Sequence, residues 1–110
     1  MASRSYRIKH VRDILKDARE IAVKLADFVE SNWKMFAYLD NPSCAEIRFY
    51  KFKPVLDVDD MHPTCREVLL NLLGAELRRR GFKVVRKYPG RQVKNHGRIA
   101  VLFVCRELST

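Results

Sequence analysis

Apolar residues recur at helical spacing near the start of the chain, and polar residues fill the positions between them. Spacings of three and four place the apolar side chains on one helix face, while charges of both signs occupy the opposite, solvated face. We therefore predict a helix over residues 10–31, and residues 33–39 either extend it or form a further turn. Pro42 ends this segment, because the residue before a proline disfavours the helical region. The apolar positions are Val11, Ile14, Leu15, Ala18, Ile21, Ala22, Leu25, Phe28 and Val29.

The polarity pattern changes in the middle of the chain. Residues 45–53 alternate in polarity and are rich in aromatic and β-branched side chains, which predicts a strand. In such a strand Tyr50 and Phe52 share one face and Phe49 lies on the other. Residues 56–62 then form an acidic connection.

A second apolar stretch predicts a helix that begins at Pro63 and ends just before Gly81. Proline suits the first turn of a helix, where its missing N–H group would have no partner. Glycine is common directly after a helix end. Arg78, Arg79 and Arg80 occupy the last turn, where cations interact favourably with the helix dipole.

Two further strands are expected over residues 82–88 and 98–106, with a loop between them. Residues 99–105 are apolar on both faces, which is typical of a central strand. We therefore place the last strand between the other two, with the second helix as a right-handed crossover. The predicted fold is α+β: two helices packed on a three-stranded mixed sheet in the order α-β-α-β-β, a split β-α-β unit with a long basic hairpin. The chain of 110 residues forms a single domain, residues 1–110, in which residues 1–9 are flexible or add a short edge strand that makes the sheet four-stranded.

This arrangement resembles half of a ferredoxin-like fold. With a further strand at residues 6–9 it would be similar to the β-α-β-α-β-β order of the Alba and initiation-factor-3 C-terminal type domains. Those families bind nucleic acid through the sheet and a basic hairpin, so the resemblance implies a nucleic-acid partner. The resemblance is one of topology and assigns no functional residue.

Charge is distributed very unevenly along the chain. Nine basic residues and no acidic ones fall within residues 78–98, whereas the rest of the chain carries 13 Lys or Arg against 13 Asp or Glu. The net charge of +9 therefore lies entirely in this stretch. A localised basic segment is the electrostatic footprint of a nucleic-acid binder.

The basic stretch supplies the predicted contacts of a non-enzymatic DNA- or RNA-binding protein. Its Lys and Arg side chains suit phosphates, and the Gln and Asn amides can contact base edges. We expect duplex to be favoured over single strands, because no pair of aromatic residues for base stacking is evident on the central strand. Tyr50, Phe52 and Tyr88 leave stacking open as an alternative. The predicted contact residues are Arg79, Arg80, Lys83, Arg86, Lys87, Arg91, Gln92, Lys94, Asn95 and Arg98.

A second hypothesis is an interaction adaptor or dimeric regulator that docks on an acidic partner. Trp33, Met35, Phe36 and Tyr38 extend the apolar surface beyond one helix face, and a large exposed patch there would mark a partner surface. A homodimer is compatible with either hypothesis, because two copies double the basic footprint.

Catalytic and metal-binding chemistry is weakly indicated. His62 and Cys65, with Cys44 upstream, have only one close pair of zinc ligands, whereas structural zinc sites use four. Acidic residues of a metal-dependent nuclease could come from Glu46 and the run Asp57, Asp59 and Asp60, but no general base accompanies them. We expect no catalytic residue, no metal and no cofactor.

The cysteines and the apolar segments bear on the compartment. Cys44, Cys65 and Cys105 are odd in number and widely spaced, which favours reduced thiols in the cytoplasm or nucleus over a secreted protein. No apolar run approaches the roughly 20 residues that span a bilayer, so no membrane association is expected.

Overall fold

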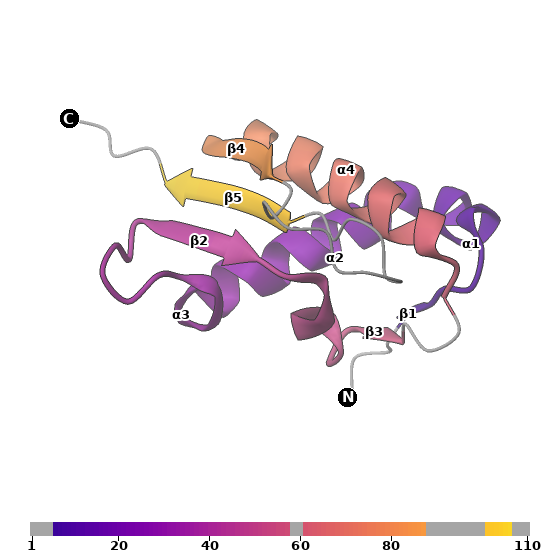
Figure 1. The fold of residues 1–110 in the computed structure, drawn as a ribbon. Helices are drawn as coiled ribbons and strands as arrows, with labels where there is room; N and C mark the ends of the chain where they lie inside the picture. Colours follow the sequence, from indigo (N-terminus) through magenta and orange to yellow (C-terminus); the bar gives the residue numbers. More distant parts are fainter. Residues whose placement is uncertain (1–5, 58–60, 88–100, 107–110) are drawn as a thin grey trace.

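The protein has two layers, a three-stranded sheet and the helices that pack against it (Figure 1). In the sheet β5 (Val101–Arg106) lies between β2 (Cys44–Ile47) and β4 (Phe82–Lys87), and both pairs are antiparallel. The two long helices, α2 (Ala18–Ser31) and α4 (Pro63–Arg79), pack against each other. The predicted combination of helices with a three-stranded sheet is confirmed. The computed structural model describes residues 6–57, 61–87 and 101–106.

The three-stranded sheet is antiparallel rather than mixed, because β5 separates the two strands that run in the same direction. A parallel pair does exist, but it stands apart: β1 (Tyr6–Arg7) pairs with β3 (Leu56–Asp57). The N-terminal strand therefore does not add a fourth strand to the main sheet. The prediction of a plain connection after residue 55 was also incomplete, because it contains β3.

The predicted first helix is divided into separate helices. After α1 (Val11–Lys16) the backbone leaves helical geometry at Asp17, where φ is −130° and ψ is 32°. A second break at Asn32 precedes α3 (Trp33–Phe36). The Asn32 side-chain amide donates to the carbonyl of Phe28 at 2.9 Å, a local bond that competes with continuation of the helix.

The predicted strand over residues 45–53 was too long. The strand β2 ends at Ile47, and η1 (Phe49–Phe52) is a 3-10 helix. Phe52 is fully buried and its ring lies 5.8 Å from that of Phe28, so core packing turns the chain inward. The expected shared face of Tyr50 and Phe52 was therefore wrong, because Tyr50 is 60% exposed.

The boundaries of α4 are as the sequence indicated. Pro63 is its first residue, and the His62 side chain accepts a hydrogen bond from the Thr64 amide at the N-terminus. Gly81 follows the helix with φ of 96°, a conformation that favours glycine. In the interior of α4, Gly74 lies over the sheet beside Val84 and Leu102, and a Cβ at this position would make only ordinary contacts with them.

The core fills the space between α2, α4 and the sheet. Its fully buried side chains come from every layer, so the helices and the sheet are held together by one apolar cluster. The largest of them are Phe52, Ile8, Ile14, Ile21, Leu25, Ile47, Leu56, Leu69, Leu73, Leu77, Val29 and Val104.

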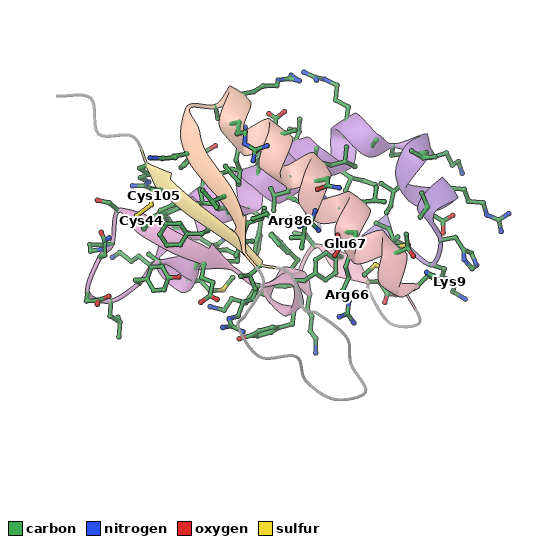
Figure 2. The ribbon with its side chains drawn as sticks, turned by 45° about the horizontal axis from the view of Figure 1, so that its top comes forward. Lys9, Cys44, Arg66, Glu67, Arg86 and Cys105 are labelled. Atoms are coloured by element: carbon green, nitrogen blue, oxygen red, sulfur yellow. A yellow bond between two sulfur atoms is a disulfide. The ribbon has the colours of Figure 1, made fainter. Side chains whose placement is uncertain are left out.

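Two of the three cysteines are joined, contrary to the prediction of reduced thiols. Cys44 and Cys105 face each other in the register of β2 and β5 and form a disulfide. Figure 2 shows this bond where β2 and β5 run side by side. Cys65 is free and buried in α4. The cytoplasmic or nuclear location expected from reduced thiols therefore loses that support.

Candidate nucleic-acid interface

The described part of the basic stretch runs from the end of α4 through Gly81 into β4, which lies at one edge of the three-stranded sheet (Figure 1). Arg78, Arg79 and Lys83 are exposed. Arg78 reaches across the turn and donates to the carbonyl of Val84 at 3.2 Å. Three exposed cations therefore lie at the end of α4 and the start of β4, on either side of the turn at Gly81.

Arg80 has a different environment from its neighbours. Its guanidinium lies 2.9 Å from Glu76 and 2.9 Å from Asp27, and it also contacts Glu30. Burial alone would lower the pKa of Arg80, but hydrogen bonds to Glu30, Glu76 and Asp27 outweigh that effect and raise it. The side chain is only 21% exposed. Arg80 therefore links the end of α4 to α2 and does not offer a free charge to a ligand.

Arg86 is also engaged within the protein. Its guanidinium donates to the Asn71 side chain and pairs with Glu67, both on α4. Figure 2 shows Arg86 directed towards Glu67 along the helix. Arg80 and Arg86, two of the predicted contact residues, are thus paired with acidic side chains within the protein. The acids that neutralise them lie outside residues 78–98, which is why the sequence pattern did not reveal them.

Among the members of the predicted set whose burial the structure describes, Arg79 and Lys83 are exposed. Within the described part of the chain, the ion pair of Arg79 is a long one, 3.8 Å from Glu76, and its side chain is 56% exposed. Lys83 lies opposite Cys105 in the register of β4 and β5. These two side chains are the described cations best placed to meet a phosphate.

The rest of the predicted set begins where β4 ends. Lys87 is the last residue of β4 and pairs with Val101, the first residue of β5. The remaining predicted contacts lie outside the described residues: Arg91, Gln92, Lys94, Asn95 and Arg98.

One face of the sheet is turned away from α4. Gly74 of α4 faces Val84 and Leu102, so the alternation along each strand places Val85 and Phe103 on the opposite side. Glu46 lies beside Phe103 on this side, since the two are register partners. We call this side the outer face and define it by Tyr38, Glu46, Lys83, Val85 and Phe103.

The outer face holds a pair of aromatic rings that the sequence reasoning missed. The ring centroids of Tyr38 and Phe103 are 5.9 Å apart, with an angle of 43° between the planes. Burial raises the pKa of the Tyr38 hydroxyl, and the neighbouring Glu46 carboxylate raises it further. The sequence did contain a signal for Phe103: in a strand over residues 101–106, its side chain lies on the face opposite to Leu102 and Val104.

The candidate zinc ligands that the structure describes have separate roles in the fold. Cys44 is in the disulfide, His62 caps α4, and the buried thiol of Cys65 approaches the carbonyl of Lys9 at 3.6 Å. Asp59 and Asp60 lie outside the described residues. Across residues 6–57, 61–87 and 101–106, no group of three or more His, Cys, Asp or Glu could hold a metal ion.

The apolar patch considered for an adaptor is largely part of the core. Trp33 is 7% exposed and its indole N–H donates to the carbonyl of Pro42 at 2.7 Å, while Phe36 is 3% exposed. Tyr38 is half-buried on the outer face. Met35 is 41% exposed. These residues do not form the large exposed patch that would mark a partner surface.

No family model, curated protein or solved structure matches this chain. None of the helices in the described part of the chain is long and apolar enough to cross a membrane.

Proposed function

We propose that the protein binds nucleic acid without catalysing a reaction, mainly through phosphate contacts from β4 and the basic residues that follow it. The observation that carries the proposal is the acid-free run of nine cations over residues 78–98. Arg79 and Lys83, in the described part of that run, have exposed side chains. Cations at such positions release counterions from a nucleic-acid backbone on binding, which is the main source of sequence-independent affinity.

The proposal includes a finer description of the fold. The elements β2, α4 and β4 form a crossover unit with β5 between its strands, and we take the connection over residues 88–100 to be a basic hairpin arm. Because Lys87 and Val101 are register partners, the arm begins and ends at the edge strand and its neighbour. The charges of the arm and the cations of β4 then form one continuous binding region.

The experiment is a titration of labelled duplex DNA, duplex RNA and single strands, followed by fluorescence anisotropy at several salt concentrations. If roughly five to seven phosphates are neutralised on duplex, log K should fall with log[salt] with a slope of about −4 to −6. A slope near zero would overturn the electrostatic mechanism. Light scattering on the same samples measures whether the protein forms a homodimer, which is compatible with this proposal.

Charge-removing variants locate the contacts. Arg79→Met and Lys83→Met should each reduce the magnitude of the salt slope by about one, because each removes one phosphate contact. Lys53→Met is the matched control, since it removes an exposed lysine outside residues 78–98 and should leave the slope unchanged.

The arm is tested separately. The triple variant with Arg91, Lys94 and Arg98 changed to Ala should bind at least about tenfold more weakly, because three cations are lost together. Its thermal unfolding and far-ultraviolet circular dichroism should match the wild type. Unchanged affinity would show that the arm makes no contact.

A further inference from the structure

The outer face combines aromatic surface with positive charge. Phe103 lies on the central strand β5, and its register partner on β4 is Val85, which is 42% exposed. The ring of Tyr38 lies against Phe103 on the side of β2. Lys83 is exposed two residues before Val85, on the same side of β4.

We propose that the outer face is a stacking platform for single-stranded nucleic acid, with bases resting on Phe103 and Tyr38 and the backbone passing Lys83. This inference rests on the proposed function and specifies the form of the ligand. Aromatic side chains on a sheet stack bases of any sequence, because every base has a π-face. The bases of a duplex are already stacked on one another, so they offer no free face to such rings.

The two rings are held in place before any ligand arrives. Both are half-buried, and they contact each other at a centroid distance of 5.9 Å. A side chain already ordered by its neighbours loses little conformational entropy when a ligand binds. Val85 extends the apolar surface across to the edge strand, so a second base can remain in contact with the sheet.

The charges around the platform favour a polyanion. Lys83 is exposed on the outer face, whereas the exposed Arg79 lies at the end of α4, the helix on the opposite side of the sheet. Glu46 is the acidic residue among the five that define the outer face, and Arg48 neutralises it at 3.0 Å. In a single strand, the phosphates can bind the cation while the unstacked bases stack on the aromatic rings. An acidic protein surface would pair with the cation but has no bases to stack on the rings.

This proposal departs from the preference for duplex that the sequence suggested. That preference depended on the absence of an evident stacking pair on the central strand. The structure places Phe103 of the central strand against Tyr38, more than 60 residues away along the chain.

The test compares single-stranded and duplex binding in matched aromatic variants. Phe103→Leu and Tyr38→Leu should each weaken binding of a labelled oligothymidylate or oligouridylate by about tenfold, the effect of losing one stacked base. Duplex binding at the same salt should change less than about twofold, since phosphate contacts are retained. Tyr50→Leu is the control, because it removes a tyrosine that is 60% exposed on η1 rather than on the sheet.

A second measurement uses the unaltered protein and does not depend on how the variants fold. Ultraviolet irradiation of the complex with oligouridylate, followed by mass spectrometry, should place crosslinks on the peptides that contain Tyr38 or Phe103. Crosslinks confined to other peptides would overturn the platform. Equal affinity of Phe103→Leu and wild type for single strands would also overturn the platform. After either result, duplex binding that still depends on salt would leave the proposed function standing. Absence of binding to every nucleic acid would overturn both proposals.

Discussion

Cys44 and Cys105 lie directly opposite each other across β2 and β5, and a disulfide joins them over a separation of 61 residues in the chain. The bond ties β2, a strand of only four residues, to the central strand. A cross-link that closes a long loop stabilises a protein mainly by restricting the unfolded chain, although enthalpic contributions are also argued. Because β2 is short, it forms few hydrogen bonds with β5, and the disulfide provides a covalent link in addition to them.

Replacing Cys44 and Cys105 together by Ser is expected to lower the free energy of unfolding by about 2–4 kcal/mol, measured by urea denaturation. Reduction of the disulfide in the wild type should also lower the free energy of unfolding. Alkylation in denaturant provides the control, because Cys65 alone should react before reduction and all three cysteines after it. Three labels without reductant would show that the disulfide is absent.

Arg80 and Arg79 are adjacent arginines whose replacement is expected to change stability by very different amounts. Arg80→Met should lower the free energy of unfolding by about 1–3 kcal/mol, because it leaves the Asp27, Glu30 and Glu76 carboxylates without their shared cation. Arg79→Met should change it by less than about 0.5 kcal/mol, since its ion pair with Glu76 is long and the Arg79 side chain is 56% exposed. The measurement is again urea denaturation. Equal effects of the two variants would contradict the bridging role of Arg80.

Two glycines should respond in opposite directions to substitution by alanine. Gly81 has φ of 96° with open space around its Cβ position, so Gly81→Ala is expected to cost about 1 kcal/mol through backbone strain alone. In the interior of α4, a Cβ on Gly74 would meet Val84 at 3.6 Å and Leu102 at 3.9 Å, which are ordinary contacts. Gly74→Ala should therefore stabilise the protein by about 0.5–1 kcal/mol through helix propensity. Midpoints of thermal unfolding that move in the same direction would refute this contrast.

Asp13 should make stability depend on pH in acid. Hydrogen bonds from the backbone N–H groups of His10 and Lys9, each 3.0 Å, hold the pKa of Asp13 below its ordinary value of 3.8. The folded state therefore binds the proton more weakly than the unfolded state does. The stabilisation is fully present above the unfolded pKa and is lost as the pH falls through the lowered one.

Asp13→Asn tests this dependence, because asparagine keeps the shape of the side chain without its charge. The variant should unfold at lower urea concentration than the wild type at pH 7. The difference should shrink as the pH falls below about 4. A difference that stays constant down to the acid limit would show that the carboxylate charge makes no contribution.

Local signals in the sequence carried over well into the structure, and signals that depend on distant contacts did not. Pro63 and Gly81 mark the ends of α4 because their effects act on the backbone beside them. In contrast, the alternation of residues 45–53 ends early, since the ring of Phe52 is drawn into contacts with Phe28 and Phe36. Those rings come from other elements, and no local pattern describes them.

In the candidate interface, too, the sequence predicted the local features but not those that depend on distant contacts. The excess of positive charge in residues 78–98 is visible from the sequence, but the engagement of Arg80 and Arg86 is not, because their partners come from α2 and α4. The meeting of Tyr38 with Phe103 likewise depends on how β5 is inserted into the sheet. Exposure and pairing are properties of the assembled fold.

The position of β5 has a consequence for how the chain folds as it is synthesised. The strands β2 and β4 make no pairs with each other, and each depends on β5, the last of the described strands. The helices precede β5 in the chain and can begin to pack first, since folding during synthesis proceeds from the N-terminus. Until β5 leaves the ribosome, the backbone edges of β2 and β4 that pair with it have no hydrogen-bonding partner. The nascent chain is therefore open to mispairing of β2 and β4 until β5 has emerged.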